Sequence, residues 1–310
     1  MMALADIVSR DLGIKKSNVG ILEDITPERL KRNLPKFQQL LAFWREYPDL
    51  FIDYLCSLNP HNTFHFFFYQ RVYLRCVMRY KYIFCCFPRA YSKSFLAVMC
   101  LMIRAILYPG AQIFVASGGK EQSANILESK VREIVKLIPA LENEIIWDTR
   151  ATPGAKTRRT KDSVAYSFKN GSVIENVSAS EKTRGRRAQS LLCEEVIGID
   201  DTILNEVLLP TLNVERRVNG QVDPDEVFNQ SQVYVTTAGF KSSFSYQKLI
   251  QLLCMSIAKP DKAIVLGGSW RTPVMEGLLN RDFVADLMSD GTFNEASFER
   301  EYRILYSINY

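Results

Sequence analysis

Residues 82–95 place a lysine and a serine where a chain that binds phosphate needs them. The apolar run Tyr82–Phe87 has the length and composition of a buried strand, and Pro88 ends it. Lys93 and Ser94 then open a second apolar run, Phe95–Leu107, which is long enough for a buried helix. In such a strand–turn–helix, backbone N–H groups hold phosphate oxygens, the lysine reaches the β- and γ-phosphates, and the serine hydroxyl binds Mg²⁺. The stretch therefore favours a phosphate-binding loop.

The loop departs from the pattern G-x-x-x-x-G-K-[ST] at both glycine positions. Phe87 stands at the first and Ser92 at the second. Glycine adopts a positive φ without strain, so Ser92 raises the conformational cost if the turn requires one. By itself, the stretch is also compatible with an ordinary strand–helix junction that contains Lys-Ser.

A second strand-like run ends in two carboxylates. Ser190–Cys193 is followed directly by Glu194 and Glu195. Burying paired carboxylates without a counterion is costly, so acids at the end of a strand favour a bound cation. The first acid can hold Mg²⁺ and the second can polarise a water for attack on a γ-phosphate. We expect these acids and the Lys-Ser turn to meet at neighbouring strand ends, although two surface acids remain the alternative.

Strand and helix patterns alternate elsewhere, which favours a parallel sheet covered by helices. Asn170-Gly171 between two alternating runs predicts a β-hairpin. Strands are predicted at Gln112–Ala116, Ser163–Phe168, Ser172–Val177, Gln232–Thr237 and Ala263–Leu266, helices at Pro27–Tyr47, Phe51–Leu58, Glu121–Ile138 and Tyr246–Ile257, and a polar exit segment at Thr292–Tyr302.

Composition limits the class of protein more than its partners. The 310 residues are 47% hydrophobic and 24% charged, which suits one large or two modest globular domains. The formal net charge of +5 is too small to indicate a polyanionic partner. Seven cysteines without a C-x-x-C pattern indicate reduced thiols of a cytosolic protein. No stretch predicts a signal peptide or a membrane span, so we expect a soluble protein.

Local features are more informative than the overall charge. Arg150–Lys161 has five basic residues and no acid, and Lys182–Arg187 is a second basic segment. Clustered lysines and arginines suit a phosphate backbone, although a solvated loop is the alternative. Upstream of the predicted phosphate loop, the aromatic run Phe64–Tyr69 precedes Gln70. Composition favours a core role for this run, whereas a glutamine amide could bind the edge of adenine.

Taken in order, these stretches resemble the ATPase domain of the large terminase subunit, the DNA-packaging motor of tailed bacteriophages. The resemblance covers roughly residues 60–302 and rests on Phe68–Arg71, Arg89–Ser94, Arg184-Gly185, Leu191–Glu195, Thr236–Ala238 and Phe298–Tyr302. It implies an α/β P-loop NTPase of the ASCE or RecA-like kind, with a mostly parallel central sheet flanked by helices. Residues 1–60 would form a helical N-terminal extension, 61–302 the ATPase domain, and 303–310 the start of a linker to a nuclease domain absent from this chain.

The resemblance also implies ATP and Mg²⁺ as cofactors and gives roles to matching residues. Nucleotide would be bound by Gln70, Arg71, Arg89, Ala90, Tyr91, Ser92, Lys93 and Ser94, and the metal by Ser94 and Glu194. Glu195 would be catalytic, with Arg89 acting beside the phosphates, and Thr236, Thr237 and Ala238 would couple hydrolysis to motion. DNA contact, or an arginine given to a neighbouring subunit, would come from Lys156, Arg158, Arg159, Arg184 or Arg187. Glu194 replaces the usual aspartate of the family.

The implied function is ATP hydrolysis that drives double-stranded DNA into a viral procapsid in the host cytoplasm. A homo-oligomeric ring, a portal and a small terminase subunit are implied partners, and neither membrane contact nor DNA cleavage by this chain is expected. Two alternatives stay open. One is another ASCE-class DNA translocase or helicase, although a second RecA-like domain is missing. The other is a non-catalytic DNA-binding scaffold, which Phe87 and Ser92 favour.

Overall fold

The centre of the molecule is an eight-stranded sheet with the strand order β10-β1-β9-β6-β2-β5-β4-β3. A computed structural model describes residues 27–150, 152, 154–218, 220–222 and 226–308. The strands are β1 (Tyr82–Cys86), β2 (Gln112–Ala116), β3 (Arg158–Arg159), β4 (Val164–Ser167), β5 (Val173–Asn176), β6 (Ser190–Glu194), β9 (Ser231–Thr236) and β10 (Ala263–Gly267). In this spatial order, the strands from β10 through β1, β9, β6 and β2 to β5 are parallel to one another. Strands β4 and β3 extend the sheet with antiparallel pairing. The predicted α/β fold with a mostly parallel sheet is confirmed.

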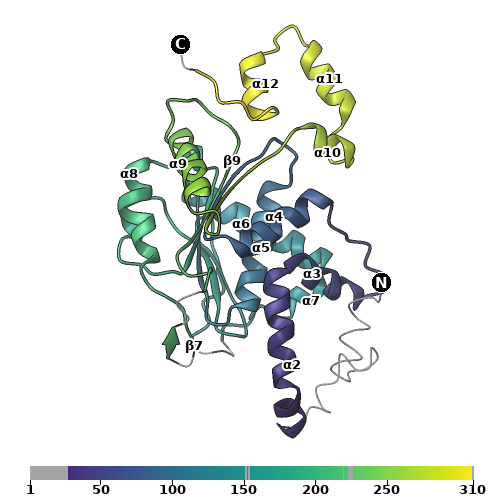
Figure 1. Ribbon diagram of the computed structural model, residues 1–310, viewed down its shortest axis with the longest axis vertical. Coiled ribbons are helices and arrows are strands. Elements are labelled where there is room, and N and C mark those ends of the chain that lie inside the picture. Colours follow the sequence, from purple (N-terminus) through teal and green to yellow (C-terminus); the bar gives the residue numbers. More distant parts are fainter. Residues whose placement is uncertain (1–26, 151, 153, 219, 223–225, 309–310) are drawn as a thin grey trace.

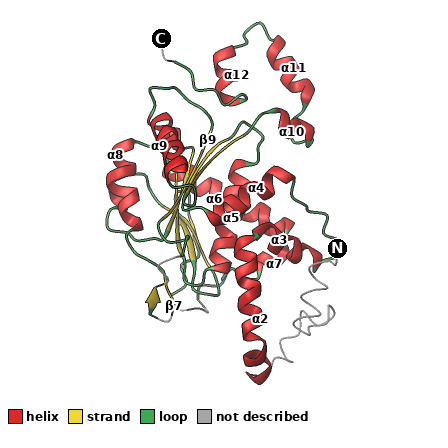
Figure 2. Ribbon diagram, viewed as in Figure 1, coloured by secondary structure: helices red, strands yellow, loops and turns green. Residues whose placement is uncertain are grey.

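Helices cover both faces of this sheet (Figures 1 and 2). One face carries α2 (Pro27–Glu46), α3 (Pro48–Ser57), α4 (Phe68–Arg79), α5 (Lys93–Leu107), α6 (Lys120–Leu137) and α7 (Pro139–Glu142), and the other carries α8 (Asp201–Ile203) and α9 (Phe244–Ala258). Residues of β1 alternate between the two cores: Ile83 and Cys85 pack in one, Phe84 and Cys86 in the other. Burial on both faces explains why this strand reads as an unbroken apolar run.

The short elements complete the chain. The Asn170-Gly171 hairpin joins β4 to β5 as predicted, with Gly171 at a φ of +85° that suits glycine. A separate two-stranded sheet pairs β7 (Arg217–Val218) with β8 (Gln221–Val222). Single turns form η3 (Glu181–Thr183), η4 (Val196–Gly198), η5 (Leu204–Leu208) and η6 (Leu209–Leu212). Among the described helices, none has the length and apolar character that crossing a membrane requires.

The last part of the chain forms a small helical lobe, which is drawn in yellow in Figure 1. It contains α10 (Arg271–Met275), α11 (Arg281–Ser289) and α12 (Glu295–Glu301), and the buried side chains of Val284, Phe298 and Tyr302 form its own core. The sequence predicted only a polar exit segment here. Beyond α12 the chain returns to the main body, where Ser307 accepts a hydrogen bond from Lys241 and donates one to Gly239.

Arg104 fixes the phosphate-loop helix to the strands behind it. Its side chain is 1% exposed, and it donates to Ser190 Oγ (2.9 Å), to Ser231 Oγ (2.8 Å) and to the Val77 carbonyl. It thereby joins α5 to β6, β9 and α4. Because β6 ends in Glu194 and α5 begins at Lys93, this buried cation helps to set the relative position of the two candidate site elements.

We expect Arg104→Ala to lower the free energy of unfolding by about 3–5 kcal/mol, because it leaves a cavity and removes the donor from two hydroxyls and a carbonyl. Urea denaturation measures the change. Lys136→Ala, at an exposed position on α6, is the control and should stay within about 0.5 kcal/mol of the wild type. A loss below about 1 kcal/mol for Arg104→Ala would contradict this account.

Candidate active site

The turn between β1 and α5 keeps the backbone shape of an anion-binding loop without glycine. Ala90 and Ser92 adopt left-handed conformations, with φ of 60° and 56°. Residues of this kind in a turn direct successive N–H groups toward one point and make a concave anion site. Ser92 lies close enough to the phenol of Tyr69 to oppose the rise in the Tyr69 pKa that burial causes. A positive φ is more strained for a serine than for the glycine usual at this position.

Ser94 connects this loop to the acidic strand end. Its hydroxyl donates a hydrogen bond to Glu194 Oε1, although β1 and β6 are not neighbours: β9 lies between them. The expectation of neighbouring strand ends was therefore wrong, but the two groups do meet, because parallel strands end at the same edge of the sheet. Lys93 donates to the Pro88 carbonyl at 3.2 Å. Burial lowers its pKa, and the carboxylates of Glu195 and Glu194 oppose this shift.

Glu194 is a buried carboxylate with an unused oxygen. Burial raises its pKa to about 7; the hydrogen bond from Ser94 opposes the rise, and the nearby Glu195 adds to it. Its Oε2 has no partner among the described residues. A buried carboxylate oxygen beside a serine hydroxyl is the hard-oxygen environment that Mg²⁺ prefers. Ser94 and Glu194 therefore fit the metal predicted for them.

Glu195 follows directly and faces the same space. It has a φ of 50°, which is costly for a residue other than glycine, and it directly precedes the turn η4. The left-handed backbone sends successive acids in different directions. Glu194 is therefore fully buried, whereas Glu195 is half-buried and lines a cavity.

That cavity has a volume of about 530 Å³, which is within the usual range for small-molecule sites. The phosphate loop and Glu195 form one part of its wall. The remainder comes from three other elements: the aromatic run (Thr63, Phe64, His65, Phe67, Gln70), α6 (Lys130, Glu133, Leu137) and Leu278 of the C-terminal lobe. The apolar members suit a base and the charged members suit phosphates.

Gln70 and Arg71 are placed differently, although both were predicted to bind nucleotide. Gln70 lines the cavity, but its Oε1 accepts a hydrogen bond from the Phe67 backbone and its amide donates to the Tyr69 hydroxyl at 3.3 Å. Arg71 pairs with Asp49 and Asp53 of α3 and is not among the lining residues. The structure thus gives Arg71 a place between α3 and α4, away from this cavity.

The C-terminal lobe holds the phosphate loop from outside. The Arg89 side chain pairs with Glu301 Oε2 at 2.9 Å, and its backbone N–H donates to the Glu301 carbonyl. Arg89, expected beside the phosphates, is 63% exposed and does not line the cavity. Tyr91 packs against Gly268 so closely that a Cβ at that glycine would lie 2.5 Å from the tyrosine Cζ. Nothing in the sequence indicated these lobe contacts, because they join residues about 180–210 positions apart.

Thr236, Thr237 and Ala238 leave the sheet at the same edge. Thr236 ends β9 opposite Cys86 of β1, and all three residues are buried. The Thr236 hydroxyl has no partner among the described residues. This buried hydroxyl lies at the end of β9, between the two strands that lead into the predicted site, β1 and β6.

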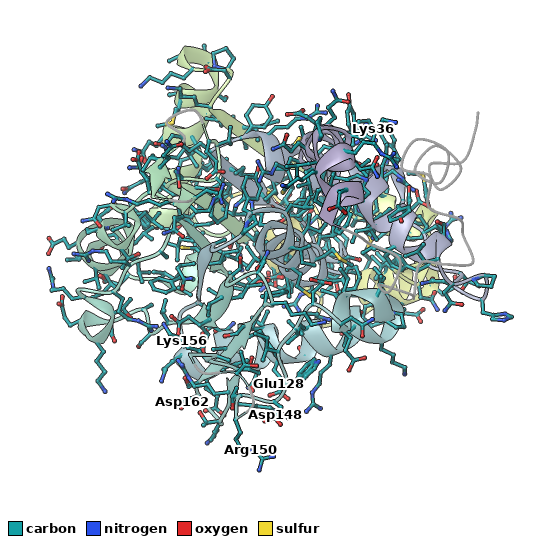
Figure 3. The ribbon with its side chains drawn as sticks, turned by 90° about the horizontal axis from the view of Figure 1, so that it is seen from below. Lys36, Glu128, Asp148, Arg150, Lys156 and Asp162 are labelled. Atoms are coloured by element: carbon teal, nitrogen blue, oxygen red, sulfur yellow. The ribbon has the colours of Figure 1, made fainter. Side chains whose placement is uncertain are left out.

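The basic candidates are largely neutralised by acids from other elements. Arg158 pairs with Glu175 at 3.1 Å, Arg159 with Glu128 of α6, and Arg184 with Glu181 at 2.6 Å. Figure 3 shows Lys156, Arg150, Glu128 and Asp162 gathered at one edge of the view. Lys156 and Arg187 are exposed and make no ion pair with a described residue. The segment without acids in sequence thus lies among acids in space.

Comparison with known proteins supports the fold. No protein-family model and no curated protein matches the chain. The solved structures include the bacteriophage HK97 large terminase, with a TM-score of 0.60 at 13% identity over 84% of this chain and 55% of that one. The large terminase of the thermophilic bacteriophage D6E in complex with ADP gives 0.53 at 14% identity over 78% and 54%. The Thermus phage P74-26 large terminase ATPase domain gives 0.52 at 16% identity over 81% and 96%.

The chain spans about half the length of the HK97 and D6E proteins and nearly all of the P74-26 domain. At these identities the likeness establishes the fold. It is the fold of the ATPase domain of phage large terminases, as the sequence resemblance implied.

The raised pKa of Glu194 predicts a pH-dependent stability difference. The folded protein keeps this proton up to a pH of about 7, whereas the unfolded chain releases it near 4.5. The stabilisation linked to this proton is therefore present below pH 4.5 and is lost as the pH rises through 7. Glu194→Gln mimics the protonated form, so it should gain stability over the wild type between pH 5 and pH 8, by on the order of 1–3 kcal/mol.

Chemical denaturation of both proteins without metal measures this difference at each pH. Glu181→Gln, which changes an exposed carboxylate, should show no such trend. A constant difference between Glu194→Gln and the wild type would mean that Glu194 titrates as an ordinary glutamate.

Proposed function

We propose that this chain hydrolyses ATP and uses the energy to move double-stranded DNA, as the ATPase domain of a viral packaging motor. The observation that carries the proposal is the hydrogen bond between Ser94 and Glu194, which joins the phosphate loop to the acidic strand end. The terminase ATPase fold supports the same reading. The full motor would be a homo-oligomeric ring at the procapsid in the host cytoplasm, in contact with a portal and a small terminase subunit.

The proposed mechanism assigns one task to each group. The N–H groups of residues 90–94 and the Lys93 ammonium hold the phosphates. Ser94 and deprotonated Glu194 would hold Mg²⁺, which when bound would supply positive charge beside the phosphate oxygens. Glu195 orients the attacking water and accepts its proton. The Mg²⁺ that accompanies the nucleotide would offset the negative charge of the Glu194 carboxylate.

Two further steps would connect hydrolysis with movement. Arg89 reaches the phosphates only if it leaves Glu301, so the occupancy of the nucleotide site would be coupled to the position of the C-terminal lobe. Thr236, Thr237 and Ala238 would respond from the end of β9. An arginine from a neighbouring subunit, with Arg158, Arg159, Arg184 and Arg187 as candidates, would stabilise the transferring phosphoryl group.

DNA contact would be directed to the backbone, because a motor must move along any sequence. Lys156 and Arg187 are the stronger candidates, since neither forms an ion pair with a described carboxylate. Arg158, Arg159 and Arg184 would have to exchange a carboxylate for a phosphate, which reduces their net contribution.

Titration with a fluorescent ATP analogue, with and without Mg²⁺, tests the proposal. Binding that strengthens with Mg²⁺ supports an ATPase, and no binding below millimolar concentration would favour a non-catalytic DNA-binding scaffold. Another ASCE-class translocase or helicase would share the nucleotide site. Unwinding of a forked duplex would favour that class, whereas movement along duplex DNA without strand separation favours the packaging motor.

Glu195→Gln should retain nucleotide binding while the rate of ATP hydrolysis falls by at least about 10², because the amide cannot accept the proton of the attacking water. Phosphate release measures the rate and the fluorescent analogue measures binding. Lys93→Ala is the contrasting variant and should lose binding itself. Unchanged turnover in Glu195→Gln would remove this residue from the catalytic role.

The double variant Lys156→Ala/Arg187→Ala should weaken duplex DNA binding and lower the slope of log K against log salt by about 2, one for each lost phosphate contact. Fluorescence anisotropy at several salt concentrations measures the slope. Arg159→Ala, whose charge is matched by Glu128, should change it less. Equal slopes for the double variant and the wild type would place the DNA elsewhere.

A further inference from the structure

One face of α6 forms part of the cavity wall. Lys130, Glu133 and Leu137 line the cavity together with Lys93 and Glu195 of the phosphate site. Their spacing of three and four residues places them on the same side of the helix. Other charged residues of α6 point elsewhere: Glu128 pairs with Arg159 and Lys120 with Asp162 of the loop before β4. Lys130 is thus the residue by which α6 presents a positive charge to the cavity.

The direction of α6 aims this charge toward the phosphate end. The helix begins after β2, at the same sheet edge as the phosphate loop after β1 and the acids after β6. Long side chains on a helix lean toward its N-terminus, so the Lys130 side chain leans toward that edge.

Without a ligand, Lys130 has only a weak partner. Its Nζ lies 2.7 Å from Glu133 Oε2, and the two side chains are 30% and 45% exposed. Exposed ion pairs at this helical spacing contribute little to stability. A phosphate oxygen in the partly enclosed cavity carries more charge and makes the stronger charge-assisted hydrogen bond. An exchange of Glu133 for phosphate would therefore be favourable.

We propose that Lys130 is a second cationic ligand of the nucleotide. Its ammonium group would exchange the Glu133 carboxylate for the terminal phosphate of ATP, opposite Lys93. This inference rests on the proposed ATPase function and adds a residue that no phosphate-loop motif contains. It accounts for a lysine that lines the same cavity as Lys93 and Glu195.

The test compares the binding of ATPγS and ADP, each with Mg²⁺, by titration calorimetry. Lys130→Ala should weaken ATPγS binding roughly tenfold to a hundredfold while ADP binding changes by less than about threefold. Lys130→Arg keeps the charge and should recover most of the loss. Glu133→Gln removes the competing carboxylate and should bind ATPγS at least as tightly as the wild type. Lys136→Ala, on the same helix but outside the cavity lining, should leave both affinities unchanged.

Each outcome decides between the possibilities. Equal losses for ATPγS and ADP in Lys130→Ala, or a matching loss in Glu133→Gln, would show that the ion pair only shapes the cavity and would overturn the proposal. Wild-type affinities in Lys130→Ala would overturn it as well, while leaving the ATPase function intact. Failure of the wild-type protein to bind either nucleotide would instead refute the ATPase function, and the role of Lys130 with it.

Discussion

The candidate site depends on one contact, the hydrogen bond that the Ser94 hydroxyl donates to the buried carboxylate of Glu194 across the end of β9. A carboxyl group with no exposed surface is costly when ionised, and this one has a single hydroxyl partner. The protein therefore holds an acid that gains most when a cation arrives. The unpartnered carboxylate oxygen lies where two parallel strands end beside the predicted phosphate loop, which makes this sheet edge a candidate metal–nucleotide site.

The loop between β1 and α5 has positive φ angles although it contains no glycine. Ala90 and Ser92 adopt left-handed conformations that glycine would adopt without strain, and other parts of the protein stabilise them. Ser92 lies beside Tyr69, Tyr91 packs against Gly268, and Arg89 binds Glu301 of the C-terminal lobe. In a glycine-containing motif, the glycines themselves permit this loop conformation. Here, contacts with aromatic side chains and with the C-terminal lobe take that part. The loop is consequently coupled to the position of the lobe.

Electrostatic neutralisation limits which basic residues can serve a polyanion. The segment Arg150–Lys161 reads as uniformly basic, yet Glu128 of α6 and Glu175 of β5 lie against it. The helix α6 thus has two charged faces, one that ties down this segment and one that presents Lys130 and Glu133 to the cavity. A helix that contacts both regions is a physical route by which the proposed nucleotide site and the basic segment can affect each other.

Local sequence patterns predicted the hairpin and the strands of the main sheet except β3, because burial on two faces and the Asn170-Gly171 turn leave local signals. The residue types of Lys93, Ser94, Glu194 and Glu195 predicted a shared site, and the structure brings these residues to one edge of the sheet. Three features became visible only in the folded chain: β9 separates the two site strands, Arg71 and Arg89 pair with carboxylates outside the cavity, and Lys130 lines the cavity. These features depend on ion pairs between distant segments and on the order of the strands in the sheet. Hydrophobic periodicity is a local pattern and predicts neither.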